Sequence, residues 1–171
     1  RLRIDAKRIP SSSSNVLARL NSGKAEKIVI TAHIDAYEST PGALDNASGI
    51  VVLLLAAEML ADYRGKYSVE ILAINGEDHY SAAGEMDYLR RYGNEIQRIA
   101  VVINIDDAGF KQGKSDYSFY ECSSELEALA ESVFRKYDGL ERGEQWYAGD
   151  HMVFVQNQVP AIAVTSERMP E

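Results

Sequence analysis

The stretch KIVITAHIDAYESTPGALDNASG, residues 27–49, decides the fold of this chain. Its first seven residues are mostly β-branched or apolar, which is typical of a strand buried on both faces of a sheet. A loop rich in glycine and proline follows over residues 35–44. Residues 45–48 then offer side chains that cap helices, directly before an apolar run that predicts a helix over about residues 47–63. A buried strand, a loop and an apolar helix are the units of an α/β protein.

The same alternation continues along the chain. Buried strands are predicted over residues 68–75, 100–105 and 161–165, weaker strands over 1–5 and 15–20, and an edge strand over 117–121. Helices are predicted over residues 82–92, 124–137 and 150–156. Because strands alternate with helices, the sequence predicts an α/β fold with a mixed, mostly parallel sheet flanked by helices on both faces. We expect residues 1–171 to form a single catalytic α/β domain cropped at both ends, because no methionine starts the chain and its first residues resemble the middle of a strand.

Composition narrows the class of protein. The chain has 171 residues, of which 46% are hydrophobic and 26% charged, as is ordinary for a globular domain. A net charge of −8 argues against a nucleic-acid partner, which would require a basic face. Cys122 is the only cysteine, so an internal disulfide is impossible. The longest apolar run, residues 50–57, is too short to span a bilayer. The cellular compartment and the oligomeric state stay unassigned.

Polar side chains follow three of the buried strands. His33 closes the first strand, Glu77 and Asp78 follow the second, and Asp106 directly follows the third, while Asp45 opens the helix after the first. Ligands in open α/β sheets gather where strands end at their carboxyl termini, so we expect these side chains to converge. Several carboxylates with one histidine suit a divalent metal such as zinc.

Simple structural roles are open for the same residues. Asp45, Asn46 or Ser48 could cap the helix. Capping does not exclude a metal role, because Asp45 could bind metal while a neighbouring residue caps the helix. Asp106 could form a turn. Ser48 lacks the GxSxG pattern of a nucleophilic serine. His79 is expected to be exposed and not to bind metal.

The spacing of the other polar groups suggests roles for them. Asp35 lies two residues after His33, so in an extended segment its carboxylate could accept a hydrogen bond from the far ring nitrogen of that histidine. Glu77 and Asp78 would repel each other in one pocket unless a cation lay between them. A metal explains the pair if one acid binds it and the other handles the proton of a water molecule.

A last polar segment lies near the end of the chain. Asp150 and His151 begin a predicted short helix after a Trp146-Tyr147-Ala148-Gly149 segment. Asp150 is a plausible N-cap of that helix. His151 either lines the site or only packs in the core.

Four segments resemble the zinc aminopeptidase family that includes bacterial leucyl aminopeptidases and, more distantly, glutamate carboxypeptidase II and glutaminyl cyclases. In the family's order they are AHIDAYESTPGALDNASG, INGEDHYSAAGEMDYL, VVINIDDAG and GDHMVFVQNQVPAIAVTSE, within residues 15–167. The resemblance implies a mixed sheet flanked by helices, a pair of zinc ions, and peptide substrates with a free N-terminus.

The resemblance also assigns roles residue by residue. Asp45 would bridge the two zinc ions, His33 and Asp106 would complete one site, and Asp78 would bind the second ion. Glu77 would be the general base and Asp35 the partner of His33. Tyr147, Asp150 and His151 would line the site, with Tyr147 helping to stabilise the oxyanion.

The chain departs from the family at two places. The family usually has Glu-Glu where this chain has Glu77 and Asp78, and Asp is one methylene shorter. The family's final histidine ligand lies beyond the segment that ends at Glu167, and His151 matches a different histidine. We therefore expect the 171-residue chain to bind about one zinc ion tightly and to show little activity.

Three functions remain open from the sequence. The first is a metal-dependent aminopeptidase, the second a glutaminyl-peptide cyclotransferase, and the third a catalytically incomplete binding domain. Asn46, after the bridging aspartate, favours the peptidase over the cyclotransferase. The identity of the preferred N-terminal residue cannot be read from these motifs.

Overall fold

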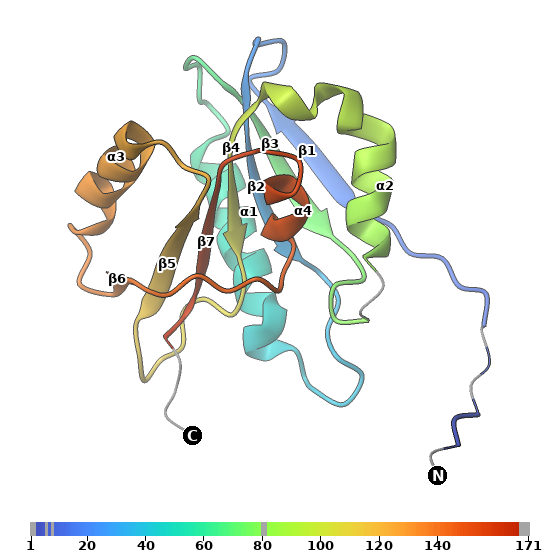
Figure 1. Cartoon of the computed structure of the whole chain (residues 1–171). Helices are drawn as coiled ribbons and strands as arrows, with labels where there is room; N and C mark the ends of the chain where they lie inside the picture. Colours follow the sequence, from blue (N-terminus) through green and yellow to red (C-terminus); the bar gives the residue numbers. More distant parts are fainter. Residues whose placement is uncertain (1–2, 6, 8, 80–81, 168–171) are drawn as a thin grey trace.

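The computed structural model describes residues 3–5, 7, 9–79 and 82–167 and shows a seven-stranded sheet with helices on both of its faces (Figure 1). Its elements are β1 (Val16–Leu20), β2 (Lys27–His33), η1 (Ala43–Ser48), α1 (Gly49–Met59), β3 (Ser68–Ile74), α2 (Ala83–Tyr92), η2 (Gly93–Arg98), β4 (Ile99–Ile105), β5 (Ser115–Tyr120), α3 (Ser124–Phe134), β6 (Leu140–Arg142), α4 (His151–Val155) and β7 (Ala161–Ser166).

The strands run in the order β1-β3-β2-β4-β7-β5-β6. The four central strands β3, β2, β4 and β7 are parallel to one another. At one side β1 pairs antiparallel with β3, and at the other β5 pairs antiparallel with β7 and parallel with β6. The sheet is therefore mixed with a parallel centre, and the prediction of fold class is confirmed.

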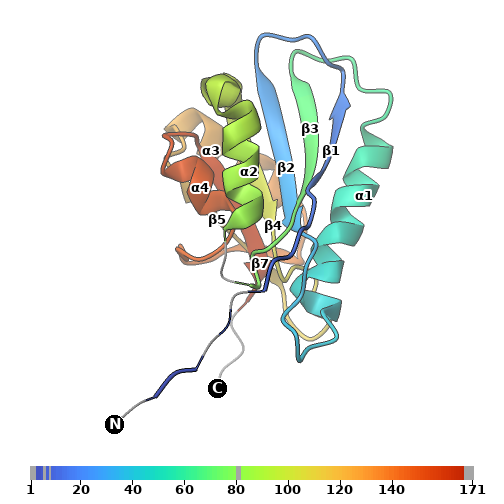
Figure 2. The ribbon, with the colours of Figure 1, turned by 90° about the vertical axis from the view of Figure 1, so that its right-hand side faces the viewer.

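Helices cover the sheet from two sides (Figure 2). On one side α1 inserts Leu53 among residues of β2, β3 and β4 such as Ile30 and Ile71. On the other side Tyr88 of α2 and Phe154 of α4 pack together, with ring centroids 5.5 Å apart, over the centre of the sheet. α3 packs on the β5 end of the sheet, where Phe134 contacts Tyr117. The central strands are thus buried on both faces along most of their length, which explains why most of their residues are apolar.

Several sequence predictions about boundaries are wrong. Residues 3–5 are not in a strand, and residues 1 and 2 of that predicted strand lie outside the described residues. β5 is not an edge strand, because the short strand β6, which the sequence did not indicate, pairs with its outer side. α1 begins at Gly49 and ends at Met59, shorter than the predicted helix over residues 47–63. α3 ends at Phe134 instead of residue 137.

The late start of α1 has a local cause. Asp45 and Asn46 leave the helical conformation inside η1, with φ/ψ of −104°/94° and −133°/40°. This irregular turn sets the side chain of Asp45 apart from the helix that follows it. Among the described residues, no helix is long and apolar enough to cross a membrane.

Candidate metal centre

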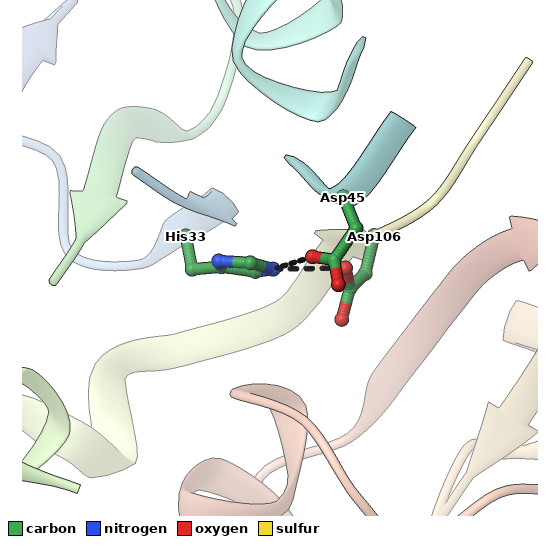
Figure 3. A group of neighbouring side chains, drawn as sticks. All are labelled: His33, Asp45 and Asp106. Carbon is green, nitrogen blue, oxygen red and sulfur yellow. Dashed lines mark hydrogen bonds and ion pairs between the residues drawn. The ribbon is translucent and has the colours of Figure 1, made fainter. Parts of the chain in front are cut away.

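His33, Asp45 and Asp106 meet at the carboxyl ends of β2 and β4 (Figure 3). His33 Nε2 lies 2.9 Å from Asp45 Oδ1 and 3.1 Å from Asp106 Oδ1. The possible ligand atoms of the three residues all lie within 4.8 Å of one another. His33 and Asp106 are buried, and Asp45 is partly exposed. The structure therefore brings together three residues that are 12 and 61 positions apart along the chain.

This geometry fits a metal ion. One imidazole nitrogen and two carboxylate oxygens converge on one point, and Zn²⁺ takes its ligands from such nitrogen and oxygen atoms. Burial by itself would lower the pKa of His33. The hydrogen bond to Asp106 and the charges of Asp106 and Glu77 outweigh burial and raise that pKa to about 10. Without another cation, the imidazolium itself balances the negative charge at this point.

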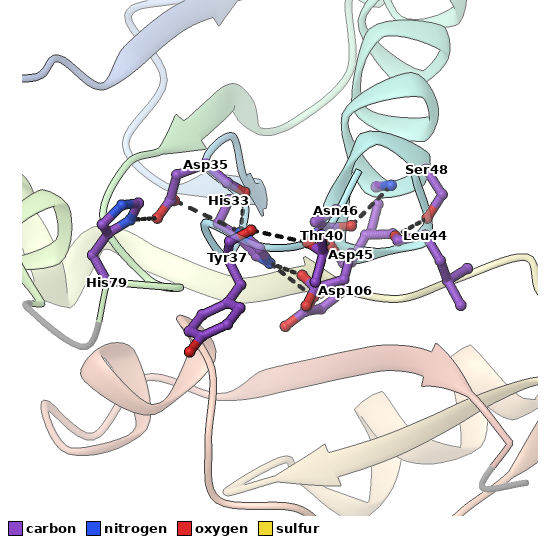
Figure 4. Close-up of polar contacts among 12 residues, drawn as sticks. His33, Asp35, Tyr37, Thr40, Leu44, Asp45, Asn46, Ser48, His79 and Asp106 are labelled. Carbon is purple, nitrogen blue, oxygen red and sulfur yellow. Dashed lines mark hydrogen bonds and ion pairs between the residues drawn. The ribbon is translucent and has the colours of Figure 1, made fainter. Parts of the chain in front are cut away.

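Asn46 holds the loop that carries Asp45. Its side-chain Nδ2 donates to the carbonyl of Ile105 at 2.9 Å, and its Oδ1 accepts from the backbone N–H of Gly49 at 2.9 Å. Asn46 is 2% exposed, so these bonds are shielded from water. Of the three capping candidates, Asn46 makes the capping bond. Ser48 donates its hydroxyl to the carbonyl of Leu44 at 2.7 Å instead (Figure 4).

The orientation of His33 comes from a backbone carbonyl. Its Nδ1 lies 3.0 Å from the carbonyl oxygen of Asp35, whereas the nearest carboxylate oxygen of Asp35 is 3.7 Å away. The expected hydrogen bond from the ring to that carboxylate is therefore replaced by one to the main chain. With no metal bound, Nε2 carries a proton that it donates toward Asp45 and Asp106. Because Nδ1 keeps its own proton on the carbonyl of Asp35, loss of the Nε2 proton would leave that nitrogen available to a metal ion.

The carboxylate of Asp35 joins two loops instead. It accepts from the backbone N–H of Gly76 at 2.8 Å. It also lies 3.0 Å from Nδ1 of His79 (Figure 4). Burial would raise the pKa of Asp35, but the hydrogen bonds from His79 and Gly76 outweigh it and lower that pKa. The side chain of His79 is 61% exposed, as predicted. Asp35 therefore ties the loop after β3 to the loop after β2.

Glu77 and Asp78 lie in the loop after β3. Burial and the charge of Asp106 raise the pKa of Glu77 to about 7. A carboxyl group with that pKa can accept and release a proton near neutral pH. Asp78 is not part of the group formed by His33, Asp45 and Asp106. Its Oδ2 is buried and has no hydrogen-bond partner among the described residues.

His151 is completely buried and both of its ring nitrogens are engaged. Nε2 lies 3.1 Å from the carbonyl of Trp146, and Nδ1 lies 3.4 Å from the side-chain nitrogen of Asn104. Its ring packs on Tyr120 and on Trp146, with centroid distances of 4.6 Å to each. Burial lowers the pKa of His151 to about 4. His151 is thus a neutral core residue that supports the segment before α4.

Asp150 does not cap α4 with its side chain. It occupies the N-cap position, yet the carboxylate makes no capping hydrogen bond. Asp150 is 1% exposed, and its carboxyl group faces that of Glu85 on α2. Burial and the charge of the partner raise the pKa of Asp150 well above its usual value, and burial also raises the pKa of Glu85. Both acids therefore hold a proton more readily than an ordinary carboxyl group does.

Sequence reasoning missed Glu85 and Asn104. Glu85 lies in the first turn of α2, where an acidic residue is usually explained by the helix dipole. Asn104 lies inside a strand, and nothing in the local sequence indicates its contact with His151, 47 residues away. Gly84 offered an indirect signal, because a Cβ at that position would lie 2.3 Å from the carbonyl oxygen of Asn75. α2 can therefore approach the end of β3 closely. The remaining site-lining residue, Tyr147, is 68% exposed and donates its hydroxyl to Gln145 at 2.8 Å.

An α/β sheet that gathers a histidine and two aspartates at its carboxyl edge offers the kind of ligands that metal-dependent hydrolases use. Comparison with known proteins specifies the family. Residues 15–171 match peptidase family M28, and the chain belongs to it. This family is one of zinc metallopeptidases acting on peptides, so the resemblance that the sequence motifs indicated is confirmed.

Two curated relatives illustrate the similarity. A probable zinc metalloprotease from Pyrenophora tritici-repentis is 34% identical over 76 residues, which are 44% of this chain and 17% of the relative. Leucine aminopeptidase 2 from Trichophyton equinum is 26% identical over 161 residues, which are 86% of this chain and 32% of the relative. The chain thus spans at most about a third of the length of either relative.

Solved structures share the fold. A zinc aminopeptidase from Bacillus subtilis superposes with a TM-score of 0.75 at 22% identity, over 89% of this chain and 39% of that one. A glutaminyl cyclase from Porphyromonas gingivalis superposes with a TM-score of 0.74 at 19% identity, over 92% of this chain and 64% of that one. At these identities the likeness shows the fold and does not separate the two activities.

Proposed function

We propose that this chain carries the metal centre of an aminopeptidase that hydrolyses the bond after a free N-terminal residue. The observation that carries the proposal is the approach of Asp45 and Asp106 to one nitrogen of His33. Membership of peptidase family M28 and the similarity to proteins named as aminopeptidases support it.

One zinc ion would be held by His33, Asp45 and Asp106. A second would lie between Asp45 and Asp78, whose buried Oδ2 lacks a partner within the described structure. When bound, zinc supplies Lewis acidity, which polarises a peptide carbonyl and lowers the pKa of a water molecule. We expect about one tightly bound ion in the 171-residue chain, because only the first group of ligands is assembled from its described residues.

Glu77 would be the general base. It directly precedes the proposed ligand Asp78, and its carboxylate would take a proton from the attacking water and return it to the leaving amine. Asp35, which holds the loop before Glu77 through the N–H of Gly76, would position Glu77 relative to His33. The carbonyl of Asp35 would keep Nε2 of His33 free to bind metal.

Two measurements test this proposal. In the full-length protein supplied with zinc, Glu77→Gln should lower kcat for aminoacyl nitroanilides by roughly 10²–10⁴-fold, the usual contribution of a general base. Zinc affinity in that variant should stay unchanged, because Glu77 is not proposed as a ligand. Unchanged turnover would exclude Glu77 as the base, and a zinc stoichiometry of two tight ions in the 171-residue chain would contradict the incomplete second site.

Glutaminyl-peptide cyclisation is the second candidate. Within the described residues, one three-residue group of possible metal ligands is assembled. This favours the cyclotransferase, because that activity would need only a single metal ion. Ammonia released from a peptide with N-terminal glutamine, without release of free amino acids from other peptides, would select this activity over the peptidase.

A further inference from the structure

A cavity of about 690 Å³ opens beside the candidate metal centre, at the carboxyl ends of β4 and β7. Asp106 lines the cavity and is also one of the three residues of the metal centre. A group bound at the metal centre could therefore extend a side chain into this space. Its volume is in the range of cavities that receive small ligands.

The cavity is acidic. Four carboxyl groups besides Asp106 line it and come from separate segments: Asp107 follows β4, Asp116 lies on β5, Glu144 precedes α4 and Glu167 follows β7. Among the described residues that line the cavity, none is a lysine, an arginine or a histidine. The fold thus concentrates negative charge from four distant parts of the chain around one space.

The same cavity also has apolar surface. Leu44, Phe110 and Trp146 form part of its lining. A lysine or arginine side chain has an apolar stem and a charged end, so it can pack its stem on apolar walls while its cation meets carboxylates. The ring of Trp146 is in addition a favourable neighbour for a cation.

The negative charge at Asp116 is not neutralised by the described part of the chain. Its Oδ1 is shielded from solvent and has no hydrogen-bond partner there. Burial and the charges of Glu141 and Glu167 raise the pKa of Asp116, and Lys114 opposes them. The ammonium of Lys114, however, is engaged by Glu141 at 2.9 Å. A cation entering the cavity would relieve this unfavourable charge.

We propose that this cavity receives the side chain of the substrate's first residue and selects lysine or arginine there. The inference rests on the proposed function, because the metal centre would place the first residue next to Asp106. It gives this chain a different preference from relatives whose names specify leucine.

Binding of two small amides tests the inference without requiring hydrolysis. L-lysinamide and L-norleucinamide share the α-ammonium and the four-carbon stem, and only the former ends in an ammonium group. By isothermal titration calorimetry of the zinc-supplied protein, we expect lysinamide to bind about tenfold more tightly, which corresponds to about 1.4 kcal/mol. The difference should shrink at high salt, because the carboxylates are partly open to solvent.

Variants identify the carboxylates responsible. Asp116→Asn preserves the shape of the side chain and should lower the preference for lysinamide severalfold without changing the affinity for norleucinamide. Glu144→Gln, at an exposed position, is a second variant that does not disturb the core. Glu58→Gln on α1 removes the same charge outside the cavity and serves as the control.

The outcomes separate the two proposals. The inference is supported if lysinamide binds selectively and if Asp116→Asn or Glu144→Gln, but not Glu58→Gln, weakens that selectivity. This holds even if no nitroanilide is hydrolysed. In that case only the proposed function fails. Equal affinity for the two amides overturns the inference even if the protein hydrolyses both lysyl and norleucyl nitroanilides. An equal effect of Glu58→Gln would also overturn it, because the preference would then reflect net charge.

Discussion

Glu70 lies in a buried ion cluster remote from the metal centre, and its replacement gives a quantitative test of the fold. Its Oε1 accepts from Arg19 Nε at 2.9 Å and Lys27 Nζ at 3.1 Å, and its Oε2 accepts from the hydroxyl of Tyr88 at 2.7 Å. Glu70 is 2% exposed and Lys27 4%. Lys27 begins β2, the strand that ends at His33, so this cluster anchors the opposite end of the same strand.

Glu70→Gln should lower the free energy of unfolding because it leaves the buried ammonium of Lys27 without its main ion-pair partner. The ammonium of Lys27 would keep only Glu95, 3.8 Å away, as an ion-pair partner within the described structure. Breaking a buried ion pair by removing one member costs about 3–5 kcal/mol. For a chain of this size, that loss lowers Tm by roughly 6–20 °C. Glu95→Gln is the matched control, since the side chain of Glu95 is 41% exposed and its ion pairs should contribute about 0–1 kcal/mol.

Guanidinium chloride unfolding followed by circular dichroism measures both variants. Adding Lys27→Met to Glu70→Gln should recover a large part of the loss, because the buried ammonium is then removed. Burial would raise the pKa of Glu70, but its hydrogen bonds with Tyr88 and Arg19 and the charge of Lys27 lower it. The stabilisation should therefore be present above the ordinary pKa of a glutamate and be lost as pH falls through the lowered pKa. A cost for Glu70→Gln no larger than that for Glu95→Gln would refute this reasoning.

Three further predictions concern the metal centre and its surroundings. Zinc at about 100 times its Kd should stabilise the protein by about 2.7 kcal/mol, and Asp106→Asn should abolish this shift in thermal unfolding; an unchanged shift in the variant would rule out Asp106 as a ligand. Burial lowers the pKa of His151 to about 4, so as pH falls this histidine is protonated in the unfolded chain before it is protonated in the folded chain. The free energy of unfolding should therefore decrease as pH drops from about 6.5 to about 4. His151→Gln should remove up to about 3 kcal/mol of this acid sensitivity in denaturant titrations, and parallel pH curves for the two proteins would contradict it. Because burial raises the pKa of Glu85 and it faces Asp150, stability should decrease as pH rises above the ordinary pKa of a glutamate. Glu85→Gln should raise Tm by a few degrees at pH 7.5 and lose that gain below about pH 4, whereas a lower Tm at pH 7.5 would contradict the raised pKa of Glu85.

The central elements and the acidic and histidine residues of the site could be predicted from local sequence. Strands buried on both faces require continuous apolar runs, and the runs before His33 and Asp106 are of this kind. Parallel strands place their carboxyl ends at one edge, so the polar residue that follows each run was expected near the others. For the same reason the sequence alone indicated a metal-binding group.

Contacts between distant residues decided the rest. Strand β6 has three residues and carries no clear periodicity, so only its pairing with β5 identifies it. The clamp of Asn46 on Ile105 joins residues 59 positions apart, and no local pattern specifies it. The pairing of Glu85 with Asp150 likewise depends on how α2 and α4 pack over the sheet. Local periodicity determines which elements form, whereas the direction of a polar side chain depends on the partner that tertiary packing brings to it.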